Sequence, residues 1–188
     1  MMFRKFANVV CSLLTVVVAL SLLSCGDVEK VGAPRSQELA EIEAVLRAWR
    51  TGYETEDVDA YINVFWADGF RYVSDMGTPD DTTDDVKFDD IREERESAIR
   101  VFSLYQDIEI ELDEPPEVEL NTERNRAEVR VHYRIQGFVA DGVSLEGGFT
   151  GWYAEGDNLF IFELRDGEWR ITEWIDEAFS KEQIEAAR

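Results

Sequence analysis

The 188-residue chain has only two cysteines and one histidine, and its 19 Lys and Arg are outnumbered by 41 Asp and Glu. So few thiol and imidazole groups exclude most zinc sites, a disulfide scaffold, and catalysis by a Ser–His or Cys–His pair. The formal net charge of −22 repels phosphate backbones, so nucleic-acid binding through a basic face is excluded. What the chain does have is apolar material, 45% of it with 12% aromatic residues, which is enough for one packed domain.

The N-terminus carries the pattern of an export signal. Arg4 and Lys5 precede a largely apolar run from Val9 to Leu23, which would rise only about 22 Å as a helix and is too short to span a bilayer. The run ends in Leu22–Gly26, Leu-Leu-Ser-Cys-Gly, and this resembles the lipobox of bacterial lipoproteins. The resemblance implies a signal peptide over residues 1–24, lipidation of Cys25 and a short tether over residues 25–35.

The lipobox resemblance also implies a location and a partner. The protein would be anchored to a membrane by its N-terminal lipid in the bacterial cell envelope, extracytoplasmic, on the periplasmic side or at the cell surface. A plain secretory peptide and an uncleaved N-terminal anchor are the alternatives. Acyl chains contribute about 0.8 kcal/mol per buried CH₂, so several of them would hold the domain tightly.

After the predicted tether, the first part of the chain has the periodicity of helices. Apolar residues recur at three- and four-residue steps over 39–53, after the potential N-cap Ser36, and again over 58–65, after the potential cap Asp57. A third helix is predicted over about 89–105, with a shared face that comprises Ile91, Arg95, Ala98, Ile99 and Phe102. Only the second half of that face is apolar enough to be buried.

The period then changes to two, which indicates half-buried antiparallel strands. The clearest runs from Ala127 to Gln136, and further strands are predicted over 108–112, 149–154 and 158–165. Asp166–Gly167 predicts a tight hairpin into a closing strand over 169–174. Trp169 and Ile171 should point to one side of that strand, with Val129 and Val131 also buried. An amphipathic stretch is predicted from Asp176 onward.

Three segments together resemble the nuclear transport factor 2-like (NTF2-like) superfamily, which includes the SnoaL-like and ketosteroid isomerase families. They are residues 42–70 with Asp68-Gly69-Phe70 at their end, the strand Ala127–Val131, and the hairpin Leu164–Ile171. The resemblance implies an α+β cone over residues 36–188, in which N-terminal helices pack in a curved mixed, mostly antiparallel sheet, with a C-terminal helical tail. Its motifs are core positions and turns, so they indicate a fold and do not indicate a reaction.

In that fold a pocket opens at the wide end of the cone, and the chain offers aromatic side chains to line it. The pocket-lining candidates are Tyr53, Tyr61, Trp66, Tyr72, Trp152, Tyr153 and Trp174. Apolar walls with a few polar tips are typical of small-molecule sites. The alternative is that these rings simply fill the core.

Two polar features have ordinary structural explanations. His132 alternates with Arg130 and Arg134 on one strand face, where Glu109 and Glu111 of a neighbouring strand could pair with them, so we expect an ion-paired surface and not a catalytic base. The segment Asp75–Asp90 contains seven aspartates without EF-hand spacing, and we expect a solvated, extended loop in place of a calcium site. The sequence thus predicts no metal site and no cofactor, and no catalytic residue can be assigned.

Two functional hypotheses follow. The first is a lipid-anchored, non-catalytic module that binds a small hydrophobic ligand or a protein partner, and a homodimer through the sheet face fits the same hypothesis. The alternative is a SnoaL-like enzyme that performs proton transfer, isomerisation or hydrolysis on a small hydrophobic substrate in the cone. A pocket carboxylate with a strongly raised pKa beside a tyrosine would favour the enzyme, and a cone filled by aromatic rings would favour the first hypothesis.

Overall fold

The first helix begins at the residue that the sequence predicts. The computed structural model describes residues 36–187, and in it α1 spans Gln37–Glu54, with the Ser36 hydroxyl accepting a hydrogen bond from the Leu39 amide. This places one acceptor on the unpaired amides of the first turn. The predicted signal peptide (residues 1–24) and the tether with Cys25 (residues 25–35) lie outside the described residues.

Two further helices begin at aspartate caps. Asp57 caps α2 (Val58–Ile62) and Asp90 caps α3 (Ile91–Leu104), each by accepting backbone amide hydrogen bonds in the first turn. A short helical turn, η1 (Glu146–Gly148), lies between the two longest strands, and α4 (Lys181–Ala187) follows the last strand. None of the helices within residues 36–187 is long and apolar enough to cross a membrane.

The buried face of α3 differs from the predicted one. Ile99 is exposed and Arg95 forms an ion pair with Asp59, whereas Glu94 and Ala98 are buried. The prediction was therefore wrong for Arg95 and Ile99, whereas Ala98 is buried and Ile91 and Phe102 pack against the core. The reason is that Glu94 accepts a hydrogen bond from Tyr61 of α2, a buried polar contact that a pattern of apolar residues does not reveal.

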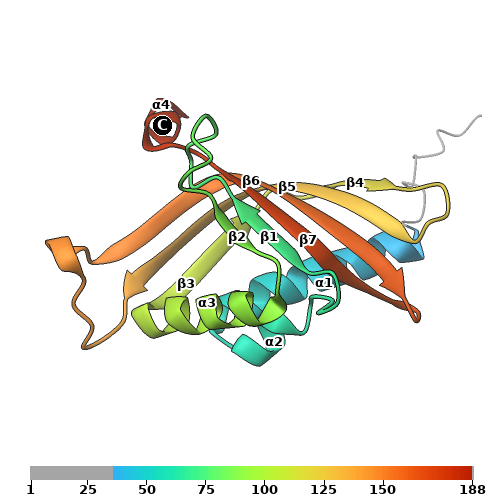
Figure 1. Ribbon diagram of the computed structural model, residues 1–188, viewed down its shortest axis with the longest axis horizontal. Helices are drawn as coiled ribbons and strands as arrows, with labels where there is room; N and C mark the ends of the chain where they lie inside the picture. The colour runs from blue at the N-terminus through green and yellow to red at the C-terminus, as the bar shows by residue number, and fades with distance from the viewer. Residues whose placement is uncertain (1–35, 188) are drawn as a thin grey trace, which may run out of the picture. The chain divides into compact units, whose positions relative to one another are not determined.

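The strands form one mixed sheet in the order β2-β1-β7-β6-β5-β3, with β4 paired to β5 (Figure 1). All pairs are antiparallel except β1 with β7. The sheet is thus mixed and mostly antiparallel, as the sequence predicts. The strands are β1 (Arg71–Ser74), β2 (Val86–Phe88), β3 (Tyr105–Leu112), β4 (Glu117–Leu120), β5 (Arg126–Val139), β6 (Gly151–Arg165) and β7 (Glu168–Ala178).

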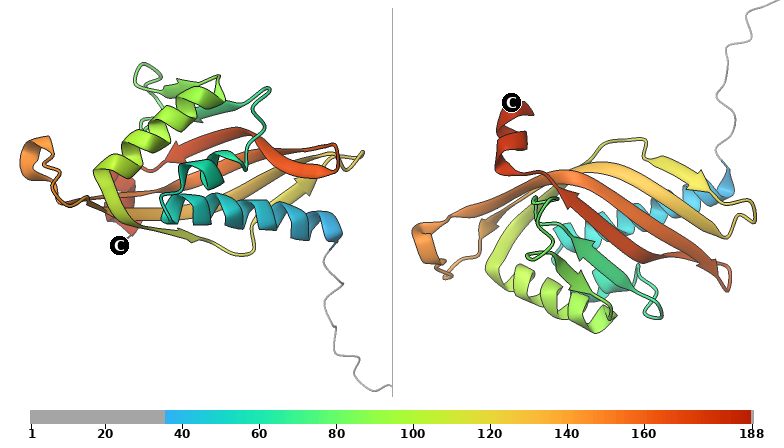
Figure 2. Two further views of the ribbon diagram at one scale, coloured as in Figure 1. Left: turned by 90° about the horizontal axis from the view of Figure 1, so that it is seen from below. Right: turned by 45° about the horizontal axis from the view of Figure 1, so that its top comes forward.

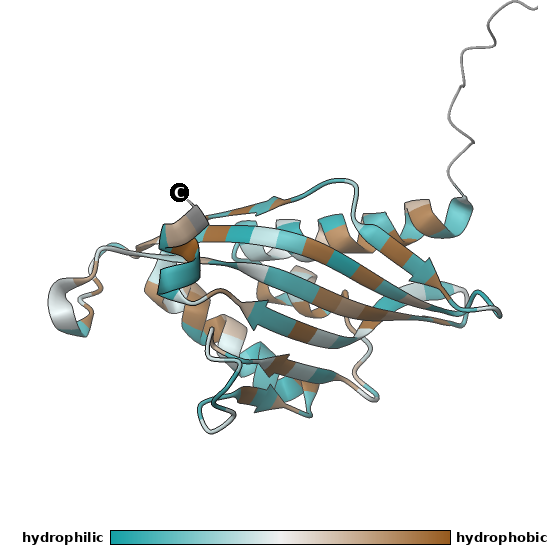
Figure 3. Ribbon diagram, turned by 90° about the horizontal axis from the view of Figure 1, so that it is seen from above, coloured by the Kyte–Doolittle hydropathy of each residue, from teal (hydrophilic) through white to brown (hydrophobic). Residues whose placement is uncertain are grey.

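The helices α1, α2 and α3 cover one face of this curved sheet, and the core lies between them and the strands (Figure 2). Apolar and polar residues alternate along the long strands, as expected when only one face is buried (Figure 3). Val129, Val131, Trp169 and Ile171 are all buried in the core, which confirms the predicted inward face of the closing hairpin.

Gly52 allows α1 and α2 to approach closely. A Cβ atom at this position would lie 2.7 Å from the backbone of Tyr61, closer than real Cβ contacts allow. Glycine therefore lets Tyr61 sit directly against α1, where its side chain is fully buried.

A β-bulge in β7 changes which residues face the core. Ile171 pairs with Phe162 and Glu173 pairs with Ile161, so Thr172 is the extra residue of the bulge. Beyond it, Trp174 pairs with Phe160 and Asp176 with Asn158. Directly opposed residues of antiparallel strands share a face, so Ile171, Trp174 and Asp176 all point to the concave side. The strand continues to Ala178, past the point where the sequence predicts its end.

Candidate active site

A cavity of about 820 Å³ opens between the concave face of the sheet and helices α1 and α3. The segment after β1, together with α4, borders its mouth, and Gly77 of that segment lies against the backbone of Phe179, just before α4. The aromatic rings thus leave space in the cone and do not fill it. Residues that form its aromatic wall include Trp49, Tyr53, Tyr72, Phe88, Tyr133 and Trp174.

Five of the seven predicted pocket-lining residues border this cavity: Tyr53, Tyr72, Trp152, Tyr153 and Trp174. Tyr72 packs on Trp174 with ring centroids 4.6 Å apart, and Tyr105 packs on Trp152. Tyr153 is at the margin, because it is partly exposed and its hydroxyl donates to Glu155 on the outer face of the sheet.

The other two candidates lie elsewhere. Trp66 is outside the cavity, where its indole N–H donates to the Glu163 carbonyl and the guanidinium groups of Arg165 and Arg170 lie over its ring. Tyr61 is fully buried behind the wall and contributes through its hydroxyl group, which donates to Glu94.

Glu94 is a buried carboxyl group in the wall that α3 provides. Its exposure is 5%, it borders the cavity, and the Tyr61 hydroxyl lies 2.6 Å from its Oε1 atom. Burial raises the pKa of Glu94 from its ordinary value of 4.5 to about 7, although the Tyr61 hydrogen bond and the Arg100 charge favour the ionised form. A carboxyl group with this pKa is populated in both protonation states at neutral pH.

Sequence reasoning missed Glu94 because it lies in the strongly charged run Glu93–Glu96. The available signal is its spacing: Ile91, Glu94, Ala98 and Val101 recur at three- and four-residue steps, so this glutamate interrupts an otherwise apolar stripe. The neighbours Glu93 and Glu96 are exposed, as expected for residues off that stripe.

Asp176 is the second carboxyl group inside the cavity and comes from the opposite wall, the sheet, whereas the exposed Glu185 borders the cavity from α4. Its Oδ1 atom accepts a hydrogen bond from the Tyr133 hydroxyl at 2.8 Å, and its Oδ2 atom accepts from Ser74 at 2.9 Å and from Tyr72 at 3.4 Å. Burial raises the pKa of Asp176, while these three hydroxyl groups favour its anionic form. The sequence predicts only an amphipathic stretch from Asp176 onward, and this pattern does not distinguish Asp176 from the other acidic residues.

The two carboxyl groups act on the same tyrosines. Burial, followed by the negative charges of Glu94 and Asp176, raises the pKa of both Tyr53 and Tyr72. Both phenols therefore remain protonated at physiological pH. The one cationic residue along the described cavity wall is Lys181, which comes from α4 at the mouth. The interior thus combines aromatic walls with negative charge.

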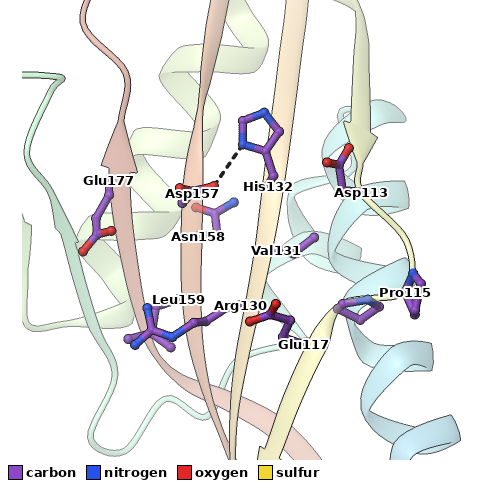
Figure 4. Close-up of a pocket in the computed structure, with 11 residues that line it drawn as sticks. Asp113, Pro115, Glu117, Arg130, Val131, His132, Asp157, Asn158, Leu159 and Glu177 are labelled. Carbon is purple, nitrogen blue, oxygen red and sulfur yellow. Dashed lines mark hydrogen bonds and ion pairs between the residues drawn. The ribbon is translucent and has the colours of Figure 1, made fainter. Parts of the chain in front are cut away.

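His132 is not part of this cavity. It lies on the outer face of the sheet in a smaller hollow, with Nδ1 2.9 Å from Asp157 (Figure 4). Its Nε2 atom lies 3.2 Å from Glu155. The expected ion pairing of this face is present, because Arg134 pairs with Glu111. His132 itself pairs with β6, whereas the sequence predicts a partner on β3.

The acidic segment Asp75–Asp90 contains more local structure than the sequence predicts. Asp75 accepts hydrogen bonds from the amides of Gly77 and Ala178, and Asp84 accepts from the Thr78 hydroxyl. Its last residues form β2 and the cap of α3. Backbone amides and hydroxyl groups thus donate hydrogen bonds to several of the carboxylates. The bond from the Ala178 amide to Asp75 connects the turn to the end of β7 beside the cavity mouth.

Comparison with solved structures identifies the fold. No protein-family model and no curated protein matches this sequence. An NTF2-like superfamily protein from Salmonella enterica superposes with a TM-score of 0.61 at 13% identity, over 77% of this chain and 92% of the other. A ketosteroid isomerase-like protein from Erwinia carotovora atroseptica gives a TM-score of 0.56 at 23% identity, over 78% and 99%. A conserved protein from Planctomyces limnophilus gives 0.60 at 16% identity, over 77% and 98%.

These similarities, together with the sheet order and the helix-covered concave face, show that the chain has the NTF2-like α+β cone fold. At such identities the likeness concerns the fold alone. The function must therefore be argued from the side chains of the cavity.

Proposed function

We propose that the domain is an enzyme that transfers protons to and from a small, uncharged and largely apolar substrate held in the cone cavity. The observation that carries the proposal is Glu94, a buried carboxyl group with a pKa of about 7 that borders the cavity beside a tyrosine. A general acid–base group works best when its pKa lies near the working pH, because it can then both accept and return a proton.

Glu94 and Asp176 would have different roles in proton transfer, because their hydrogen-bond partners differ. Asp176 accepts hydrogen bonds from three hydroxyl groups, which favour its anion, whereas the structure gives Glu94 one such donor. Two carboxyl groups on opposite walls could move a proton from one side of a substrate to the other, as an isomerisation or an elimination requires.

The cavity walls indicate the substrate class. Flat aromatic side chains on several sides favour a ring-containing or otherwise apolar molecule, and about 820 Å³ lies within the range of small-molecule sites. Buried negative charge disfavours carboxylate or phosphate substrates, since like charges repel strongly where water is excluded. We therefore expect a neutral substrate.

A purely binding role explains the buried carboxyl less well. A neutral apolar ligand needs no ionisable group, and ionising Glu94 in a desolvated site costs folding free energy at neutral pH. Costs of this kind tend to persist at functional sites. We further propose, from the lipobox-like segment, that the domain is carried by a lipid on Cys25 at the outer side of a bacterial membrane.

Deuterium exchange tests the proposal without knowledge of the natural substrate. Indanone, a bicyclic aryl ketone, is incubated with the protein in D₂O, and loss of the proton signal next to the carbonyl is followed by NMR. We expect saturable, protein-dependent exchange that rises with pH through about 7, as Glu94 ionises.

The matched variants are Glu94→Gln and Glu96→Gln, both in α3. Glu94→Gln should abolish the catalysed exchange because it removes the proton acceptor. Glu96→Gln should not change it, because Glu96 is exposed. Indanone that binds in the cavity but exchanges no faster than in buffer would show that the site only binds ligands.

A further inference from the structure

The cavity contains hydrogen-bond donors that the protein itself does not satisfy. Among the described residues, the amide nitrogen Nδ2 of Asn158 and the indole nitrogen Nε1 of Trp49 are buried without a hydrogen-bond partner. Both residues border the cavity, and their exposed fractions are 1% and 2%. Buried donors without partners are rare in native proteins, because each loses its hydrogen bonds to water without a replacement.

The orientation of the Asn158 amide is fixed by its neighbour. Trp174 donates its indole N–H to the Oδ1 atom of Asn158 at 2.6 Å. An indole nitrogen can only donate, so the atom that it contacts must be the amide oxygen, and the other atom of the amide must be the NH₂ group. Asn158 therefore presents two N–H bonds that no protein acceptor uses.

Asn158 also lies next to the proposed chemistry. Its backbone pairs directly with that of Asp176 in the antiparallel register of β6 and β7, and both side chains are on the concave face. Directly opposed side chains have Cβ atoms about 4.5–5.5 Å apart. A ligand atom held by Asn158 would thus lie beside the Asp176 carboxylate.

Trp49 reaches the same region from the helical side of the cavity. Its ring lies 5.4 Å from that of Trp174 and nearly perpendicular to it, at 82°. The ring is also packed against Phe160 at 5.3 Å. These contacts hold the indole rigidly, so its N–H is a fixed donor and not one that can rotate to find an acceptor.

We propose that Asn158 and Trp49 form an oxygen-binding subsite, so that the ligand of this cavity carries an uncharged acceptor oxygen such as a ketone, lactone or amide carbonyl. The inference rests on the proposed function for the location of the ligand, and it adds the group that the ligand must contain. A carboxylate oxygen could also accept these hydrogen bonds, but Glu94 and Asp176 line the same cavity and would repel it.

The subsite offers hydrogen-bond donors, whereas the two carboxyl groups offer negative charge and acceptors. A carbonyl would direct its oxygen to the Asn158 and Trp49 donors, and the donors would withdraw electron density from it. This would make the adjacent C–H more acidic. Asn158 and Trp49 are thus assigned as positioning and specificity-determining residues.

A matched pair of ligands tests the subsite. Indanone and indane have the same bicyclic skeleton, and only the ketone has an acceptor oxygen. Binding of each to the wild-type protein is measured by quenching of tryptophan fluorescence and checked by calorimetry. We expect indanone to bind about tenfold more tightly, as one or two satisfied buried donors would give. Indane carboxylate should bind more weakly than either.

The variants remove the donors: Asn158→Asp retains the shape of its side chain, and Trp49→Phe retains an aromatic ring of smaller size. Trp49→Phe removes the indole N–H, and Asn158→Asp removes the amide N–H bonds while it keeps an acceptor for Trp174. Each should weaken indanone binding several-fold and leave indane binding unchanged. Trp169→Phe is the control, because Trp169 also has a buried unpartnered indole N–H but does not border the cavity. Melting curves establish that each variant is folded, and Trp49→Phe carries the test if Asn158→Asp is not.

Each outcome discriminates. Equal affinities of the wild-type protein for indanone and indane would overturn the subsite and leave the proposed acid–base function standing. An equal loss of affinity for both ligands in Trp49→Phe would also overturn it, because the effect would then be one of shape. Binding of neither ligand would contradict the ligand class of the proposed function. Selective loss of indanone binding, with exchange still dependent on Glu94, would support both.

Discussion

The hydroxyl group of Tyr61 in α2 lies 2.6 Å from the carboxylate of Glu94 in α3 and points toward it from behind the cavity wall. Tyr61 can be so deeply buried because Gly52 lets its backbone sit against α1. Three helices thus cooperate to hold one carboxyl group in an apolar environment. The protonation state of Glu94 consequently depends on helix packing as well as on solvent.

The first prediction concerns stability and pH. The pKa of Glu94 in the folded protein, about 7, is above its ordinary value of 4.5, so the folded state binds the proton more tightly than the unfolded state. The contribution of the protonated carboxyl to stability is complete below pH 4.5, and it is lost as the pH rises through 7. Glu94→Gln should therefore stabilise the protein at pH 8, by roughly 2–4 kcal/mol, and have little effect at pH 4.

Urea denaturation at the two pH values measures this difference, with Glu96→Gln as the control on the same helix. A Glu94→Gln variant that is less stable than the wild-type protein at pH 8 would mean that the ionised carboxylate is well solvated, contrary to its burial.

The second prediction separates the roles of Tyr61 and Tyr53. The Tyr61 hydrogen bond favours the ionised form of Glu94, so Tyr61→Phe should raise the pKa of Glu94 further above 7. The pH at which deuterium exchange is half-maximal should move upward with it. Tyr53→Phe is the matched control, because Tyr53 is buried nearby but the structure gives its hydroxyl no bond to Glu94. An unchanged pH profile in Tyr61→Phe would show that Glu94 is not the group that titrates.

The third prediction concerns the closing hairpin. Trp169 is buried in the core, and Trp169→Ala should cost about 3–5 kcal/mol because a large cavity would remain. Phe149→Ala, at an exposed aromatic residue, should cost far less. Chemical denaturation measures both, and melting of Trp169→Ala like that of the wild-type protein would place this side chain outside the cooperative core.

The fourth prediction concerns the proposed lipid anchor. Cys25→Ala should abolish lipid attachment, and the domain should then appear in the soluble fraction of the cell envelope. Membrane fractionation after a salt wash measures this, and labelling with a radioactive fatty acid provides an independent readout. Retention of the variant in salt-washed membranes would indicate that the apolar run before Cys25 remains as an anchor.

The fold could be predicted because it depends on repeated features. Alternation along β5, the Asp166–Gly167 turn and the caps Ser36 and Asp57 each report on local geometry, and all appear in the structure. Several aromatic residues of the cavity could be predicted for a similar reason, because large rings on inward positions must lie near the cone.

The two carboxyl groups could not be found in the same way. Glu94 looks like one more charge on an acidic helix, and its burial depends on Tyr61, 33 positions earlier in the chain. Asp176 faces the cavity because the β-bulge at Thr172 changes which alternate residues of β7 point inward, and the sequence pattern does not reveal this bulge. In a chain with 41 acidic residues, these two are distinguished by what packs around them.

Because of the bulge at Thr172, odd-numbered residues face the core in the first half of β7 and even-numbered residues face it in the second half. Upstream of Thr172 the odd-numbered residues Trp169 and Ile171 face the core, whereas downstream the even-numbered Trp174 and Asp176 do. Continued without the bulge, the odd series would bring Glu173, Ile175 and Glu177 into the cone and put Asp176 outside. Substitutions at those three odd positions should therefore alter only the outer face of the sheet. One extra residue thus decides which side chains of the second half of β7 face the cone and which face the outer side of the sheet.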